Sequence, residues 1–309
     1  MTPAGGAEQR VGAPAASAYL LLIVPPLCWA GNFVVGRAIH TEIPPAALTF
    51  WRWAVAAAVL LPLAGLEAWR AREAIRRQWP LLTMLALTGV VGFQFVVYQG
   101  LHSTTAINGV LIIATIPAVI PAIAFALDGE RITRRQGLGI LLSSLGVAII
   151  VLRGDLGAAL VLDVAAGDLW IATAVPMWAL YSVLVRRKDA ALPPLALLLA
   201  IVGIGLAVLA PGYALEIAAV GGFAPTPAGL AAIAYVGIAA SVLAFWCWNR
   251  GIAGVGASKA GLYLHLMPVF AALLAVAFLG ERLYAYHGVG MSLVATGLFL
   301  SSTAGGRRQ

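Results

Sequence analysis

Two apolar stretches of the chain carry an aromatic residue and a hydrogen-bonding residue at helical spacing. Trp29 stands three residues before Asn32, and Trp178 stands three residues before Tyr181. Residues three or four apart share one face of a helix. Such a face offers a flat apolar surface for a ring and hydrogen-bonding groups for a polar head, as small-molecule sites do. The alternative is helix–helix packing with an interhelical hydrogen bond.

Other apolar stretches repeat this combination of polar and aromatic side chains. Lipid cannot satisfy such polar groups, so we expect them to face protein or a water-filled cavity. The further candidate binding residues are Gln94 and Tyr98, Asn108, Ile112 and Thr115, Trp246 and Asn249, and Lys259 and Tyr263.

Three ionisable residues in apolar stretches each allow more than one interpretation. Lys259 could hold the carboxylate of a ligand, but a lysine near the start of a helix also snorkels to the membrane surface, and the sequence favours the second role. Arg52 stands between two tryptophans and is expected to be a structural arginine, bonded to carbonyls or stacked on indole. His265 is expected to be neutral and hydrogen-bonded.

The sequence contains no constellation that supports covalent chemistry. It lacks H-E-x-x-H, G-x-S-x-G, an aspartate pair within an apolar stretch and a Cys/His cluster. Its four histidines stand in different segments, so no metal or other cofactor is expected. Cys28 and Cys247 are interpreted as buried thiols. An intramembrane enzyme is disfavoured, and a scaffold or receptor is a further alternative.

These residues belong to a chain that must face lipid. Of its 309 residues, 62% are hydrophobic and 10% are charged, whereas a soluble domain carries about 25% charged residues. A helix needs about 20 apolar residues to cross a bilayer. Breaks at proline, glycine and charge clusters predict an all-α integral membrane protein with ten transmembrane helices. They are expected near residues 18–37, 45–66, 79–99, 106–127, 135–152, 167–186, 193–213, 228–249, 256–279 and 285–303.

One sequence motif, which we call the GER phrase, occurs twice, 151 positions apart: GERITRRQGLG at residues 129–139 and GERLYAYHGVG at residues 280–290. Trp29 likewise recurs as Trp178 at an offset of 149. The chain therefore contains two copies of a five-helix unit. Because five is odd, the second copy crosses the membrane in the opposite sense, which makes an inverted repeat around a central cavity. The expected divisions are a flexible N-terminus (1–17), the first repeat (18–152), a linker (153–166), the second repeat (167–303) and a tail (304–309).

The distribution of basic residues predicts the orientation. With both termini on one side, fifteen Lys and Arg residues fall on that side and three on the other. Cytoplasmic loops collect such residues, so both termini are expected in the cytoplasm, with the protein in a bacterial inner membrane. The second copy of the phrase lacks Arg134 and Arg135, as inversion requires. The same bias explains the net charge of +7, and no nucleic acid partner is expected.

Prolines within the predicted helices are candidate hinges, because each removes a backbone donor and favours a kink. They are Pro25, Pro26, Pro117, Pro176 and Pro268. Pro117 and Pro268 are the strongest candidates, since they are repeat partners at the offset of 151. Bent helices at matching places in two halves indicate a binding site near the middle of the membrane.

The stretches CWAGNFVVGR and TFWRWAVAA, with the paired blocks that close in GER at Glu130 and Glu281, resemble the drug/metabolite transporter superfamily. Within it, residues 18–303 are most similar to the ten-span EamA-like exporters. The resemblance implies two inverted halves, alternating access and a small-molecule substrate, in a protein that acts as a monomer in contact with membrane lipid. Among these exporters the chain looks most like those of hydrophobic, aromatic amino acids.

Other substrates and couplings stay open. Exporters of other metabolites or drugs, and nucleotide-sugar or phosphometabolite antiporters, belong to the same superfamily. Phosphorylated substrates call for paired cations, and the repeat partner of Lys259 is the neutral Asn108, which disfavours them. No predicted helix carries Asp or Glu near its middle, so proton antiport through a carboxylate relay is disfavoured too. The mechanisms that stay open are facilitated diffusion and proton coupling through His265.

Overall fold

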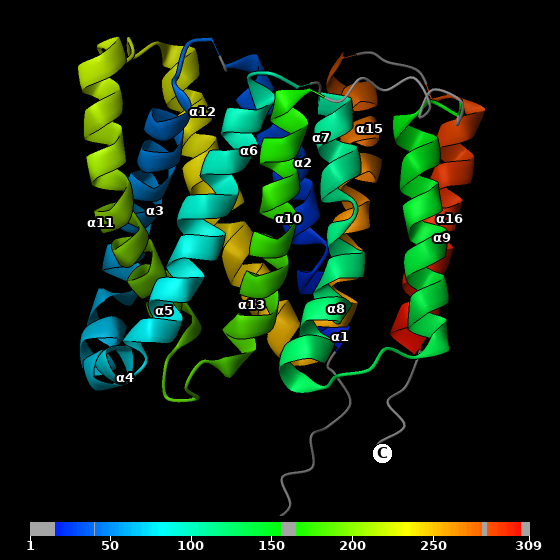
Figure 1. Ribbon diagram of the computed structural model, residues 1–309, viewed down its shortest axis with the longest axis horizontal. Coiled ribbons are helices and arrows are strands. Elements are labelled where there is room, and N and C mark those ends of the chain that lie inside the picture. Colours follow the sequence, from blue (N-terminus) through cyan, green and yellow to red (C-terminus); the bar gives the residue numbers. More distant parts are fainter. Residues whose placement is uncertain (1–15, 40, 105, 156–164, 280–282, 304–309) are drawn as a thin grey trace, which may run out of the picture.

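In the computed structural model the chain is described over residues 16–39, 41–104, 106–155, 165–279 and 283–303, and some side chains within these ranges, including that of Asn108, lie outside the description. The described residues form helices and their connections, without a strand (Figure 1). Nine of their segments are long and apolar enough to cross a membrane. The predicted all-α membrane fold is therefore confirmed.

Each half of the chain supplies five crossings, several of them built from short helices in series. The first half holds α1 (Ala16–Leu21), α2 (Val24–Ala38), α3 (Pro45–Arg70), α4 (Arg72–Arg77), α5 (Trp79–Leu85), η1 (Ala86–Gly92), α6 (Phe93–Leu101), α7 (Ala106–Ile113), α8 (Ile116–Asp128) and α9 (Arg134–Val151). The second half holds α10 (Ala166–Leu184), η3 (Val185–Arg187), α11 (Pro194–Val220), α12 (Pro227–Gly237), η4 (Ile238–Leu243), α13 (Ala244–Val255), α14 (Ala257–Gly261), η5 (Leu262–His265), α15 (Leu266–Leu279) and α16 (Ala285–Thr303). The tenth predicted crossing is α16, which packs along α9 at one edge of the molecule (Figure 1).

The ends of the helices follow from local sequence in both repeats. A Pro-Pro pair opens α3 and α11, with its first proline as the N-cap and its second as the first helical residue; proline suits that position because its missing N–H is unpaired there anyway. At the start of α9, Thr133 and Gln136 form a capping box. The two Pro-Pro pairs stand 149 positions apart, so they extend the repeat to the second and seventh crossings.

Two stretches expected to be connections are partly helical. The seventh crossing was expected to end near residue 213, but α11 continues to Val220 and ends at Gly221, whose φ of 81° is left-handed. Pro211 lies inside α11 without ending it, because prolines are tolerated within membrane helices that have neighbours. The basic stretch after α3 likewise forms the short helix α4.

Close glycine contacts show how the two repeats are related. A Cβ added to Gly139 would stand 2.6 Å from the Gly297 carbonyl oxygen, and one added to Gly146 would stand 2.6 Å from that of Gly290. Residue numbers rise along α9 as they fall along α16, so these helices are antiparallel. The two contacts exchange places under the repeat offset of 151. A two-fold pseudo-axis therefore relates the halves, and small residues let their backbones approach, as in other membrane helix pairs.

Helix interruptions occur at matching places in the two halves. The third and eighth crossings each contain a π-helical segment, η1 and η4. The fourth breaks between α7 and α8, just before Pro117, and the ninth passes through the 3₁₀ segment η5 just before Pro268. Pro25 and Pro26 follow the break between α1 and α2, whereas Pro176 lies within the uninterrupted α10. Four of the five candidate hinge prolines thus stand beside a break.

Candidate functional site

The tryptophans that are repeat partners meet at the centre of the bundle. The ring centroids of Trp29 and Trp178 lie 4.9 Å apart at an interplanar angle of 86°, an edge-to-face geometry that aromatic pairs favour. Further rings surround Trp178, with centroid distances of 4.8 to 5.8 Å; they belong to Phe93, Tyr181, Phe245 and Trp248. We call these six residues the aromatic cluster. Because two residues related by the repeat touch within it, the cluster lies on the pseudo-axis.

A second buried group surrounds the guanidinium of Arg52, whose exposed fraction is 0%. Its Nη1 donates to Gln94 Oε1 and to the Tyr98 hydroxyl, each at 2.7 Å, and its Nε donates to Ser241 Oγ at 2.9 Å. The Tyr98 hydroxyl donates to Asn32 Oδ1 at 2.8 Å. We call these five residues the polar cluster. Every partner in it is neutral, and among the described residues no carboxylate forms an ion pair with Arg52.

One pair of hydrogen-bonded residues is exchanged between the repeats. Tyr98 donates to Asn32 in the first repeat, and in the second the Tyr181 hydroxyl donates to Asn249 Oδ1 at 2.9 Å. Asn32 and Tyr181 are repeat partners, as are Tyr98 and Asn249, at the offsets of 149 and 151. The hydrogen bond is therefore kept on both sides of the axis while its donor and acceptor residues change helices.

The charge is not repeated across the axis. At the offset of 149 the partner of Arg52 is Ile201, and at 151 the partner of Gln94 is Phe245. Both partners are buried apolar residues. The site is thus cationic and polar beside the first repeat, and aromatic beside the second.

The π-helical segment η4 supplies partners to both clusters, and η1 supplies a partner to the neighbouring Trp53. The Trp29 indole Nε1 donates to the Ala240 carbonyl in η4 at 2.9 Å, and Trp53 Nε1 donates to the Val90 carbonyl in η1 at 2.8 Å. Ser241, which binds Arg52, also stands in η4. A π turn inserts an extra residue into a helix and occurs most often at functional sites. Here the inserted residues expose carbonyls that fix the orientation of two indoles.

The cavity between the clusters is small. It has a volume of about 20 Å³ and is lined from five crossings by Trp29, Asn32, Phe93, Gln94, Val97, Ile113, Ile116, Trp178, Leu264 and Met267. One water needs about 10–15 Å³ on this measure. A substrate therefore requires that the helices around the axis separate.

Two nitrogen donors beside this cavity lack a protein partner. Arg52 Nη2 and Trp178 Nε1 are buried without a hydrogen bond among the described residues. A buried donor left unpaired costs about 1–3 kcal/mol, more when it is charged. Donors without acceptors indicate a ligand that brings acceptors, such as a carboxylate.

The structure brings together six of the thirteen residues that the sequence singled out. Trp29 and Trp178 belong to the aromatic cluster with Tyr181, and the polar cluster contains the other three, Asn32, Gln94 and Tyr98. Asn249 joins this set through Tyr181. For Asn108 the side chain lies outside the described residues.

The remaining five described side chains, which come from the fourth, eighth and ninth crossings, do not line this cavity. They are those of Ile112, Thr115, Trp246, Lys259 and Tyr263. Thr115 is exposed, and its hydroxyl donates to the Ile112 carbonyl. An unbroken helix would have aligned these two residues with Asn108, but the break at Thr115 turns Ile113 and Ile116 toward the cavity instead.

Trp246, Lys259 and Tyr263 also stand away from the cavity. Trp246 packs under the Arg250 guanidinium, whose carbon lies 5.7 Å from the ring centroid. Its place in the aromatic cluster is taken by Trp248. Lys259 is half-buried, and Tyr263 stacks on Tyr19 with centroids 6.4 Å apart.

Sequence reasoning interpreted Arg52 as a structural arginine bonded to carbonyls or stacked on indole. Its guanidinium carbon does lie over the Trp53 ring, 5.2 Å from the centroid, and the same guanidinium also holds the polar cluster together. Phe245, Trp248 and Ser241 were not singled out. Their positions in the site follow from η4, which shifts the helical face by one residue. The sequence pattern did not predict that insertion.

His265 joins the two broken crossings. Its Nε2 donates to the Ala114 carbonyl at 3.0 Å, and its Nδ1 lies 2.7 Å from Ser143 Oγ. Ala114 and His265 are repeat partners, 151 positions apart. The Ala114 carbonyl stands at the break between α7 and α8, where Ala118 N–H bonds to Thr115 instead. In the neutral tautomer Nδ1 accepts from the serine hydroxyl, which agrees with the expected hydrogen-bonded histidine.

Three ion pairs join the repeats at one end of the bundle. This end carries α4 and lies at the bottom of Figure 1, and we call it the basic end. Each pair links the first repeat to the segment that follows α10. The pairs are Glu130–Arg186 (2.7 Å), Asp128–Arg187 and Arg77–Asp189. They close the basic end in this conformation.

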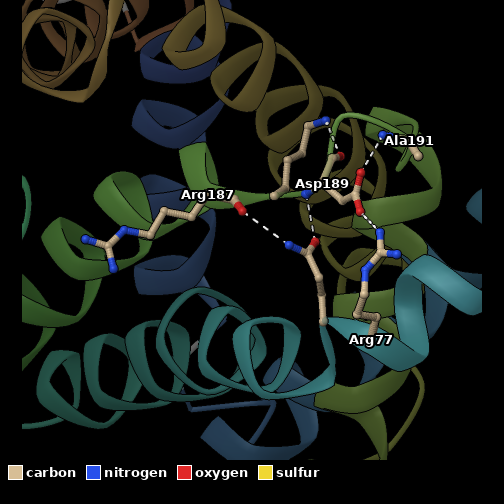
Figure 2. Close-up of polar contacts among 6 residues, drawn as sticks. Arg77, Arg187, Asp189 and Ala191 are labelled. Carbon is tan, nitrogen blue, oxygen red and sulfur yellow. Dashed lines mark hydrogen bonds and ion pairs between the residues drawn. The ribbon is translucent and has the colours of Figure 1, made fainter.

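We call these three ion pairs the ion-pair lock, and Asp189 is the member with contacts on both sides of its carboxylate. Figure 2 shows its carboxylate between Arg77 and the Ala191 N–H, which donates at 2.8 Å, while the Arg187 side chain points away. The Ala191 N–H and then Arg77 hold the pKa of Asp189 below its usual range. The Arg77–Asp189 pair therefore stays ionised at neutral pH and weakens as the pH falls through the lowered pKa of Asp189.

The opposite end is also closed by contacts between repeats. Glu216 at the end of α11 accepts from the Ala46 and Ala47 N–H groups at 3.0 and 2.7 Å. These groups open α3, where the helix dipole favours a carboxylate. Thr226 donates to Glu42 at 3.1 Å. Contacts between the repeats therefore join both ends of the bundle in this conformation.

The fold and the site together define a class: a helical membrane protein of two inverted repeats with a mixed aromatic and cationic site on the axis between them. Residues 16–152 and 165–303 each match the EamA-like transporter family. Because the two matches span most of the sequence, the chain belongs to that family. It is a multi-pass membrane transporter.

Curated relatives agree with this class. Uncharacterized transporter YyaM of Bacillus subtilis (strain 168) is 28% identical over 92% of this chain and 93% of its own. An uncharacterized transporter of Archaeoglobus fulgidus is also 28% identical, over 92% and 96%. The "probable terminal-alkyne amino-acid exporter" of Streptantibioticus cattleyicolor is 27% identical, over 93% and 95%. A solved crystal structure is similar with a TM-score of 0.74 and 22% identity, over 92% of this chain and 97% of its own, which supports the fold alone.

Proposed function

We propose that this transporter exports hydrophobic, chiefly aromatic, amino acids by alternating access. The observation that carries the proposal is a buried arginine without a carboxylate partner, placed beside a cluster of six aromatic rings. A buried charge is costly unless it is paired. The carboxylate of an amino acid supplies the missing partner of Arg52, and the aromatic cluster supplies a surface for its side chain.

Each cluster contributes a different part of the binding energy. Aromatic pairs add about 0.5–1.5 kcal/mol beyond the burial of their area, so the cluster around Trp178 favours flat rings over small side chains. Asn32 and Gln94 offer amide oxygens to the ammonium group. The neutral partners of Arg52 hold the cation while the site is empty, and the substrate need only displace part of that shell. Such partial pairing suits a transporter that must also release its cargo.

The relative in Streptantibioticus cattleyicolor supports an amino acid substrate, since it is named a probable terminal-alkyne amino-acid exporter. For this chain we place the basic end in the cytoplasm of a bacterial inner membrane, with both termini on that side and a single chain as the functional unit. We further take residues 18–152 and 167–303 as the two repeats, joined by the linker 153–166.

We infer that export does not rely on a membrane carboxylate. The described residues at the two clusters include Arg52 and no acidic side chain. Facilitated diffusion needs no titrating group. Coupling through His265 would need its contacts with Ser143 and Ala114 to change with the state of the transporter.

The test is uptake of labelled amino acids into liposomes that hold the pure protein, with and without a pH gradient. We expect saturable uptake of Phe and Trp, much slower uptake of Ala, and no dependence on the gradient. Nucleotide-sugar and phosphorylated metabolites serve as the competing substrates. Transport of those compounds without any amino acid would overturn the proposal.

A further inference from the structure

A second, larger cavity opens at the basic end between η3, α11 and α13. It has a volume of about 240 Å³, against about 20 Å³ for the cavity on the axis. Its polar lining residues are Arg186, Lys188, Asn249 and Arg250, and its apolar ones are Val185, Pro194, Leu197, Ile252 and Ala253. No acidic side chain lines it. We call it the basic cavity.

Two of its cations have no carboxylate to neutralise them. Lys188 Nζ donates to the Leu192 and Asp189 carbonyls at 3.0 and 3.4 Å, which leaves one of its three donors. Arg250 stacks over Trp246. Within the described ranges, neither forms an ion pair, because the neighbouring Asp189 carboxylate is turned to Arg77 (Figure 2). Only Arg186 is paired, with Glu130.

Asn249 connects this cavity to the axis. Its exposed fraction is 7%, and its Oδ1 accepts from Tyr181, whose ring stacks on Trp178 at 5.3 Å. Its Nδ2 has no hydrogen-bond partner among the described residues. An unpaired amide donor on a side chain that lines the same cavity as Lys188 and Arg250 favours an anionic acceptor. The same side chain thus contacts the aromatic cluster through one atom and lines the basic cavity.

We propose that the basic cavity is a carboxylate-binding vestibule, in which Lys188, Arg250 and Asn249 hold the amino acid by its carboxylate before it reaches the axis. This inference rests on the proposed function, which supplies the substrate. The vestibule is open while the ion-pair lock beside it is closed. Only the Asn249 side chain then stands between its occupant and Tyr181, a member of the aromatic cluster.

The vestibule can be tested by binding, independently of transport. The probe is 3-phenylpropanoate, with phenethylamine as the partner that lacks a carboxylate, added to the full chain in nanodiscs of zwitterionic lipid. Arg250 lies over Trp246, so the difference in fluorescence between the parent and its Trp246→Phe variant reports on this cavity alone. We expect the carboxylate to change that signal and the amine to leave it unaltered.

The matched variants have equal charge. Lys188→Gln with Arg250→Gln should weaken 3-phenylpropanoate binding at least about tenfold, as loss of charge-assisted hydrogen bonds implies. The control removes two exposed arginines of the basic end that lie outside the cavity, Arg134→Gln with Arg135→Gln, and should change nothing. Equal weakening in both doubles would mean a diffuse surface potential and would overturn the vestibule. The vestibule would also be overturned if anionic phospholipid, in place of 3-phenylpropanoate, saturated the change in fluorescence.

The pH dependence offers a separate check. Burial, and then the nearby Arg250, lower the pKa of Lys188, while Asp189 acts in the opposite sense. Lysine holds a carboxylate only when protonated, so binding should fall as the pH rises through that lowered value, earlier than for an ordinary lysine. Of the other charged groups at the basic end, Arg186 lines the same cavity and is held by Glu130, and Arg77 is held by Asp189. Lys188→Arg should remove the alkaline loss, and an unchanged profile in that variant would contradict the role of Lys188.

Failure of the proposed function would look different. If the wild-type protein transports no amino acid yet binds 3-phenylpropanoate with loss in the Lys188 and Arg250 double variant, the vestibule stands and the amino acid assignment falls. If phenylalanine is transported with the same KM in both double variants, the amino acid assignment stands and the vestibule falls.

Discussion

At the scale of single residues, the proposed function depends on Arg52. Its three shortest hydrogen bonds go to an amide, a phenol and a serine hydroxyl, all neutral. These partners keep the guanidinium in place without cancelling its charge, and an arginine retains that charge in proteins. The residue can therefore position the polar cluster and attract a carboxylate at the same time.

The first prediction separates these two roles. Lys keeps the charge but cannot form the planar fork of Arg. Arg52→Lys should raise KM for Phe roughly ten- to a hundredfold, in line with the 1.5–3 kcal/mol of a hydrogen bond to a charged group. Binding of phenethylamine, which lacks the carboxylate, should change little. Equal loss for both ligands, with normal elution of the folded protein, would show that Arg52 is structural only.

The second prediction concerns the aromatic surface. Trp178→Ala should lower Phe and Trp transport about tenfold relative to Ala transport, because the ring contact of the substrate is lost. Trp170→Ala on the same helix is the control, since Trp170 is exposed. Competition uptake in liposomes gives the ratio. If all substrates fall together, or only the amount of folded protein falls, Trp178 is a packing residue.

Sequence reasoning found the residues whose helical face is undisturbed. Trp29 with Asn32 and Trp178 with Tyr181 stand in continuous helices, so the 3.6-residue period placed them well. Trp246 shares α13 with Asn249, with no interruption between them, and only Asn249 joins the site. Thr115 was assigned by the same period across a local interruption, the α7–α8 break. Such local insertions depend on tertiary partners such as His265 and Arg52, which a local pattern does not contain.

At the scale of elements, the interruptions define what can move. The α7–α8 break and η5 meet at the His265–Ala114 contact, where repeat partners touch. Helices broken at matching positions let each half bend without losing its own backbone hydrogen bonds. The prolines beside the breaks keep them from closing into continuous helix.

The third prediction addresses these prolines. Pro117→Ala and Pro268→Ala restore a backbone donor and favour straight helices, so they should slow exchange between the two access states several-fold while leaving substrate affinity near that of the parent. Pro62→Ala within α3 is the control, because that helix is uninterrupted. Exchange and binding are measured in the same liposome preparation. Native exchange rates in both variants would remove the hinge role.

At the scale of the whole molecule, the inverted repeat was predictable and its asymmetry was not. Aligned glycines, prolines and the GER phrase defined two five-helix units, and the antiparallel contacts of α9 with α16 agree with inversion. The substitution of Arg52 by Ile201 is visible in the sequence. The consequence of that difference is not visible in the sequence, because only the fold shows that both positions flank one axis.

The fourth prediction fixes the orientation. Single cysteines at Arg134 and Tyr284, in a Cys28→Ser and Cys247→Ser background, should react with a membrane-impermeant thiol reagent from opposite sides. Both positions are exposed in the structure, so access is not limited by burial. We expect Tyr284→Cys to label in intact cells and Arg134→Cys only after permeabilisation. Labelling of both from one side would end the inverted-repeat account.

The central claim is that transport requires the two repeats to separate at the basic end, which three ion pairs now hold closed. The most direct measurement joins Arg77→Cys to Asp189→Cys with a cleavable bifunctional thiol reagent and follows exchange of labelled phenylalanine in liposomes. A pair within one helix, Arg72→Cys with Arg76→Cys, receives the same treatment as the control. We predict that exchange in the cross-linked inter-repeat pair falls to background and returns on cleavage, while the control pair exchanges throughout. Full exchange in the cross-linked inter-repeat pair would contradict alternating access about this axis.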